Sequence, residues 1–142
     1  FIMFLFFYQP ALKGQAVHLT PEFFLAFFLG HCVSFFFVTA LAMTALFVEE
    51  SQSIFETYYA PALILGGQMV PIETLPSWAV SIAKFLPFYY TAGFPTEVLI
   101  GRGTGAKVYE GIGFQLLFIV LSILTWKVLW AKGTRHYSGV GM

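Results

Sequence analysis

One long uncharged stretch constrains this chain more than any other feature of its sequence. Residues 23–48 contain no Asp, Glu, Lys or Arg. As a helix, the stretch would span roughly 39 Å at about 1.5 Å per residue, which exceeds the roughly 30 Å hydrocarbon core of a bilayer. A soluble helix of that length needs a polar face, and here only scattered Ser, Thr, His and Cys side chains are polar. The stretch therefore predicts a membrane protein with a first crossing at 22–48.

The composition supports a membrane location. Hydrophobic residues make up 58% of the chain, the mean hydropathy is +0.80, and only 10% of residues are charged, against about 25% in soluble domains. This composition makes the lipid bilayer an expected partner. The formal net charge is zero, so no basic surface favours nucleic acid. Cys32 is the one cysteine, which excludes an intrachain disulfide.

Two further crossings are expected. The first, at 54–70, carries Pro61 in its early turns and a Gly-Gly pair near its end, and Pro71 prevents easy continuation of that helix. The second lies at 110–131, where the pattern Trp-Lys-x-x-Trp-x-Lys at its end marks a membrane–water interface.

The segment 71–107 between these crossings is too apolar for a plain loop and is interrupted by four prolines. The pattern predicts two short helices. Ser77–Leu86 separates Ser77, Ser81 and Lys84 from an apolar face of Trp78, Ile82, Phe85 and Leu86. Pro95–Ile100 has helix start and stop signals in Pro95, Glu97 and Gly101. Such helices lie flat at the interface or dip into the membrane and return, packed against protein.

Charge counting does not orient the chain. Loops 9–21 and 71–110 share one side and carry four Lys or Arg, whereas loop 49–53 and the C-terminal tail share the other side and carry three. This difference is too small to decide orientation under the positive-inside rule.

Two ionisable residues are candidates for a polar path through the membrane. His31 lies inside the first uncharged stretch; it either faces a functional pathway or is a neutral imidazole bonded to a neighbouring helix. Glu56 either lines a pathway or sits at the positive N-terminal end of its helix in the headgroup region, and we favour the second interpretation.

Enzymatic and cofactor sites are not expected. The run Gly101-Arg-Gly-Thr-Gly-Ala-Lys107 departs from the Walker pattern, which needs Gly-Lys-Ser/Thr, and we interpret it as a flexible turn. Neither metal-ligand spacing nor a nucleophile–base arrangement is evident in the sequence, so no catalytic, cofactor or metal residues are assigned.

The second half of the chain carries motifs that resemble the ABC-2 type transporter permeases, in a branch of bacterial members that work as pairs. The motifs are Tyr-Tyr-Ala-Pro-Ala-Leu-Ile-Leu-Gly-Gly-Gln-Met-Val-Pro71, Ile-Glu-Thr-Leu-Pro76, Phe-Leu-Pro87-Phe, Phe-Pro95-Thr-Glu-Val-Leu-Ile-Gly101 and the closing Gly-x-x-x-Tyr-Ser-x-x-Gly at 133–141. The resemblance covers nearly all of the chain and is most specific from Tyr58 onward.

The resemblance implies a six-helix permease of which this chain is the C-terminal half, with 1–8 as the tail of an upstream helix. It also implies that 71–107 is an extracytoplasmic hairpin and that the tail 132–142 is cytoplasmic, in a multi-pass protein of the inner (plasma) membrane. The implied partners are an ABC ATPase subunit, which binds and hydrolyses the ATP, and a second permease subunit in a homo- or heterodimer.

The sequence thus predicts an all-α membrane protein, one transmembrane domain over 1–142, with three full transmembrane helices plus a broken amphipathic hairpin before the last helix. The expected function is the permease subunit of an ATP-driven exporter. The alternative is a non-transport membrane scaffold or an intramembrane enzyme that uses His31. Candidate pathway or gate residues are His31, Glu56, Gly66, Gly67, Pro71, Lys84 and Pro87.

Overall fold

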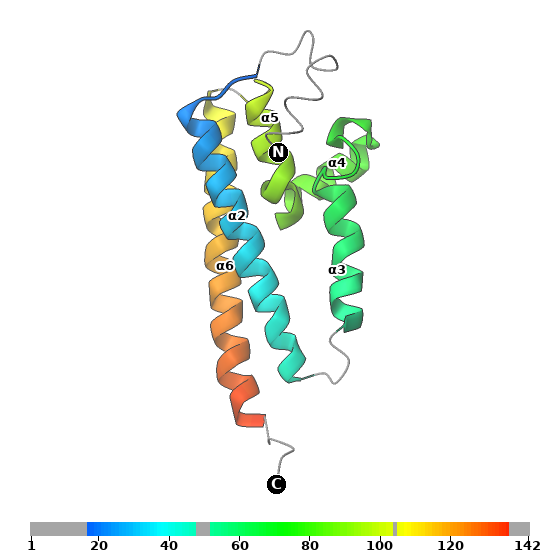
Figure 1. Cartoon of the computed structure of the whole chain (residues 1–142), viewed down its shortest axis with the longest axis vertical. Helices are drawn as coiled ribbons and strands as arrows, with labels where there is room; N and C mark the ends of the chain where they lie inside the picture. Colours follow the sequence, from blue (N-terminus) through cyan, green and yellow to red (C-terminus); the bar gives the residue numbers. More distant parts are fainter. Residues whose placement is uncertain (1–16, 48–51, 104, 137–142) are drawn as a thin grey trace.

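The described residues form a helical protein without strands. The computed structural model describes residues 17–47, 52–103 and 105–136 (Figure 1). In chain order the elements are α2 (Pro21–Ala42), the 3₁₀ turn η1 (Met43–Leu46), α3 (Gln52–Leu65), the 3₁₀ turn η2 (Ile72–Thr74), α4 (Ser77–Phe85), the π-helix η3 (Tyr89–Gly93), α5 (Phe94–Leu99) and α6 (Ala106–His136). The all-α prediction is confirmed for this part of the chain.

Helices α2 and α6 form the main axis of the molecule. They pack along each other and run in the same direction (Figure 1). Pro21–Leu46 and Ala106–Thr134 are both long and apolar enough to cross a membrane, which agrees with the crossings predicted at 22–48 and 110–131. Thr20 starts α2 because its hydroxyl accepts a hydrogen bond from the Phe23 N–H, at 3.3 Å, and Pro21 suits the first helical position.

The crossing predicted at 54–70 is not confirmed as a full span. Helix α3 has 14 residues, which is roughly 21 Å of helix and short of a hydrocarbon core. It ends because Gly67 adopts a left-handed φ of 70°, and the N–H groups of Gln68 and Met69 turn back to the Leu63 carbonyl. Two full spans, rather than three, are supported.

The hairpin is present, and both of its predicted short helices are found to within one residue at each end. Helix α4 matches the expected Ser77–Leu86 segment almost residue for residue. The second piece was expected at Pro95–Ile100, and α5 carries Pro95 and Glu97 in its first turn as predicted. The sequence did not predict the π-helix η3, which leads directly into α5.

The packing of α4 refines its predicted amphipathicity. Trp78, Ile82 and Phe85 are exposed, as are Ser81 and Lys84. A third face made of Ala79 and Ala83 is buried against the rest of the chain. Small side chains therefore dock the helix, and its large apolar side chains remain available to lipid.

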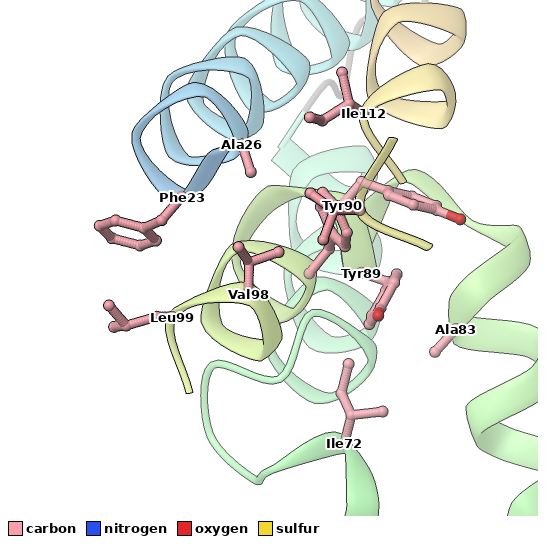
Figure 2. Close-up of a cluster of buried hydrophobic side chains, with 11 residues drawn as sticks. Phe23, Ala26, Ile72, Ala83, Tyr89, Tyr90, Val98, Leu99 and Ile112 are labelled. Atoms are coloured by element: carbon pink, nitrogen blue, oxygen red, sulfur yellow. The ribbon is translucent and has the colours of Figure 1, made fainter. Parts of the chain in front are cut away.

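The hydrophobic core lies at the hairpin end of the α2–α6 pair. Its residues come from every element there: Phe23, Ala26, Ile72, Ala83, Tyr89, Tyr90, Phe94, Val98, Leu99, Val108 and Ile112 (Figure 2). The hairpin is consequently part of the packed interior at this end, and is more than a surface loop.

Two expectations concern the ends of the chain. The predicted helix tail at 1–8 lies outside the described residues. Of the predicted tail 132–142, residues 132–136 continue α6, so that helix extends beyond the expected end of the crossing at 131.

Candidate functional site

The hairpin contains a π-helix that leaves one backbone carbonyl without a helical donor. In η3 the Phe94 N–H donates to the Tyr89 carbonyl, as the i to i+5 pattern requires. The next bond in that pattern would join the Tyr90 carbonyl to the N–H of residue 95, which is proline and has none. A buried carbonyl without a partner is costly, so Tyr90 needs a donor from elsewhere.

Gln115 on α6 supplies that donor. Its Nε2 donates to the Tyr90 carbonyl at 3.0 Å and to the Ala26 carbonyl of α2 at 2.8 Å. The side chain is 0% exposed, and its Oε1 has no hydrogen-bond partner. One amide thus joins three elements, and we call this arrangement the Gln115 bridge. It holds the hairpin to the two spanning helices.

Gly30 allows the close approach that the Gln115 bridge requires. A Cβ at this position of α2 would lie 2.7 Å from the Thr91 carbonyl oxygen and 3.1 Å from that of Tyr90. Real Cβ atoms essentially never come as close as 2.7 Å to another heavy atom, so a side chain here would force the backbone of η3 to shift. The glycine therefore lets η3 lie directly against α2.

The hydroxyl groups of two tyrosines in the π-helix connect it to the two short helices of the hairpin. The Tyr89 hydroxyl donates a 2.6 Å hydrogen bond to Glu97 Oε2 of α5, and the Tyr90 hydroxyl donates to the Lys84 carbonyl of α4 at 3.0 Å. Burial, assisted by the bond to Glu97, raises the pKa of Tyr89 far above its ordinary value. Burial also raises the pKa of Tyr90 to about 12, with smaller contributions from the Glu110 and Glu97 carboxylates. Both hydroxyls are therefore protonated donors at neutral pH.

A cleft of about 480 Å³ opens beside this pair, between α4, the η3–α5 segment and the start of α6. Charged side chains of both signs line it, together with aromatic rings: Lys84, Arg102, Lys107, Glu97, Glu110, Phe85, Tyr89, Tyr90, Phe94 and Phe114. We call this space the hairpin cleft. The Lys84 ammonium lies 5.8 Å from the centre of the Tyr89 ring, within the range of a cation–π contact.

Four of the predicted candidates gather around the hairpin. Lys84 lines the hairpin cleft, and buried Pro87 begins the helical turn that leads into η3. Gly66 packs against the hairpin, since a Cβ there would lie 3.1 Å from the Phe88 carbonyl oxygen. Gly67 contacts Ile72 of η2.

The remaining candidates are exposed. Pro71 opens the hairpin, where it caps η2. His31 is exposed on α2, with its ring 4.8 Å from that of Phe27 on the same helix, so the described helices do not enclose it. Glu56 is exposed on α3 just beyond its first turn, and its position in the headgroup region stays a prediction.

Sequence reasoning missed the residues that connect the hairpin to the helix pair. Gln115 was detectable, because it is an amide inside an otherwise apolar spanning helix and such residues usually face protein. Gly30, in contrast, gave no signal, since nothing local indicates which glycine lies against another backbone. Among the described residues, no cluster of three or more His, Cys, Asp or Glu could hold a metal ion.

Comparisons with known proteins bear on this architecture. The chain matches the family model described as ABC-2 family transporter protein over residues 2–141. No curated protein and no solved structure matches the chain. The family match agrees with the apolar spanning helices and extends over nearly every residue. The chain therefore belongs to the ABC-2 family of transporter proteins.

Proposed function

We propose that this chain is part of the permease subunit of an ATP-driven exporter, in which it forms one wall of the substrate path. The observation that carries the proposal is the family match over residues 2–141, combined with two helices that can span a membrane. ATP would be bound and hydrolysed by a separate ABC ATPase subunit. A second permease subunit, identical or related, would complete the path.

The topology of the proposal follows the family resemblance. The hairpin at 71–107 lies on the extracytoplasmic side of the inner membrane, and the residues after α6 lie in the cytoplasm. This orientation agrees with Lys127 and Lys132 near the end of α6. The hairpin then forms the outer gate of the path, and transport proceeds by alternating access.

The architecture supports a gate that moves as one body. The η3–α5 segment is packed through Gly30 and Gln115 against both spanning helices, so a change in the α2–α6 angle is transmitted to the hairpin. The hairpin is joined to α3 by a turn that contains Gly67 in a left-handed conformation. These features give the hairpin a rigid attachment on one side and a turn on the other.

Reconstitution with an ATPase tests the proposal. The protein is placed in vesicles with and without a candidate ABC ATPase, and with an ATPase variant whose Walker lysine is replaced. We expect ATP hydrolysis and transport only with the intact ATPase. ATP hydrolysis by the chain without any partner would contradict the subunit assignment.

A paired substitution tests the role of the hairpin. Lys84→Leu removes an exposed charge from the hairpin cleft, and Lys127→Leu removes an exposed charge near the other end of α6. We expect both variants to insert and assemble, and only the first to alter export. Equal export by the two variants would argue against an outer gate at the hairpin. The described residues give no support to the alternative of an enzyme using His31, whose side chain is exposed.

A further inference from the structure

The hairpin cleft is lined by charged groups of both signs, which we call its cationic and anionic poles. The cationic pole comprises Lys84 from the last turn of α4 and Lys107 from the first turn of α6, and Arg102 also lines the cleft. The anionic pole comprises Glu97 and Glu110, both close enough to the Tyr90 hydroxyl to raise its pKa. Among the described residues, no ion pair joins these two lysines to these two carboxylates. The four charges thus surround a space and do not neutralise one another by direct contact.

The local backbone and aromatic rings reinforce both poles. Lys107 is the second residue of α6, where the unpaired N–H groups of a long helix favour an anion. The rings of Tyr90 and Phe114 also line the cleft, and aromatic faces of this kind bind ammonium groups. A phosphate and an ammonium a few ångströms apart would meet complementary groups at both ends.

An apolar surface leads from the hairpin cleft along the spanning helix. Phe114 lines the cleft and is partly exposed, and Leu117 and Leu121 follow it at helical spacing on α6, about half exposed. On the hairpin side Phe85 is 82% exposed. A polar, soluble ligand would gain no favourable contact from this apolar surface. Acyl chains attached to a headgroup would pack along it.

We propose that the hairpin cleft binds the headgroup of a zwitterionic phospholipid with a primary amine, of the phosphatidylethanolamine class. Lys84 and Lys107 bind the phosphate, Glu97 and Glu110 accept hydrogen bonds from the ammonium, and the acyl chains lie against Phe114 and Leu117. The position at the start of a spanning helix places the site at headgroup depth. The proposal does not depend on transport, because the site exists in this chain without an ATPase.

Native mass spectrometry of the purified protein tests the proposal. The protein is released from micelles that contain equal amounts of phosphatidylethanolamine and phosphatidylglycerol, which share the phosphate and differ in the amine. Loss of a charged hydrogen-bond partner typically changes affinity about tenfold. We therefore expect roughly tenfold greater retention of phosphatidylethanolamine. Equal retention of the two lipids would overturn the proposal.

Three variants distinguish the roles of the cationic and anionic groups in lipid retention from nonspecific effects of removing a charge. Glu110→Gln, chosen because Glu110 is exposed, should reduce the preference between the lipids while retaining the phosphate contact. Lys107→Gln should lower retention of both lipids. Lys127→Gln, at the other end of α6, is the matched control and should change neither. An unchanged lipid ratio in Glu110→Gln, or unchanged retention in Lys107→Gln, would refute the assignment of that pole.

Soluble phosphoethanolamine distinguishes a lipid from a free headgroup. It carries both charges and lacks the acyl chains, so we expect it not to displace the lipid when present at the same concentration. Displacement at equal concentration would show that the occupant is a soluble phosphate ester and would overturn the lipid assignment.

Discussion

The Gln115 bridge gives a sharp test of why the hairpin is attached to the helix pair. Replacing Gln115 by Leu keeps a side chain of similar size and removes the donor for the Tyr90 and Ala26 carbonyls. Ala26, inside α2, retains the helical bond of that position, whereas Tyr90 has no alternative because residue 95 is proline. The main consequence is that the buried Tyr90 carbonyl has no hydrogen-bond donor.

The expected cost is modest and can be worked out. An unpaired buried carbonyl costs about 1–3 kcal/mol, and removal of the unpartnered Gln115 Oε1 offsets part of that cost. Side-chain hydrogen bonds between membrane helices average about 0.6 kcal/mol each, and two are lost. Both routes lead to a loss of about 1 kcal/mol in the free energy of unfolding.

A double-mutant cycle makes the test specific. Pro95→Ala restores an N–H that can donate to the Tyr90 carbonyl in the π-helical pattern. We expect Gln115→Leu to cost about 1 kcal/mol with Pro95 present and clearly less in the Pro95→Ala background, as measured by reversible denaturant unfolding in micelles followed by tryptophan fluorescence. Equal costs in the two backgrounds would refute the reasoning that proline creates the need for the Gln115 bridge.

Three further predictions address the packing, the titration and the topology. Gly30→Ala should destabilise the protein by about 1–3 kcal/mol through contact with the η3 backbone, whereas Gly113→Ala, where a Cβ meets nothing within 4 Å, should not; equal effects in thermal unfolding would contradict the close approach. The stability linked to Tyr90, whose folded pKa of about 12 lies above the ordinary 10.0, should be intact below pH 10 and be lost as the pH rises toward 12; a flat unfolding profile across this range would argue against it. A cysteine at Ser138, introduced after Cys32→Ala, should resist an impermeant thiol reagent in intact cells; strong labelling from outside would reverse the proposed topology.

Several elements were readable from local sequence because their causes are local. The uncharged run at 23–48 predicted a spanning helix, because a segment in the hydrocarbon core must pair its own backbone polar groups. The prolines and the amphipathic period of Ser77–Leu86 predicted α4, and Gly101 marked the end of α5 with a φ of 74°. The crossing at 54–70, which is not confirmed as a full span, also ends for a local reason, because Gly67 stops α3 after Leu65.

The sequence by itself determined that this chain is a helical membrane protein with a broken hairpin before its last helix. These features depend on apolar side chains, prolines and glycines, each of which affects the backbone only within a few residues of its own position. Only the tertiary structure decided that Gln115 donates to the Tyr90 carbonyl and that η3 packs against Gly30. It also decided that charged side chains from α4, α5 and α6 line one cleft. These relations join residues far apart in the chain. Their partners are chosen by packing, which no local pattern encodes.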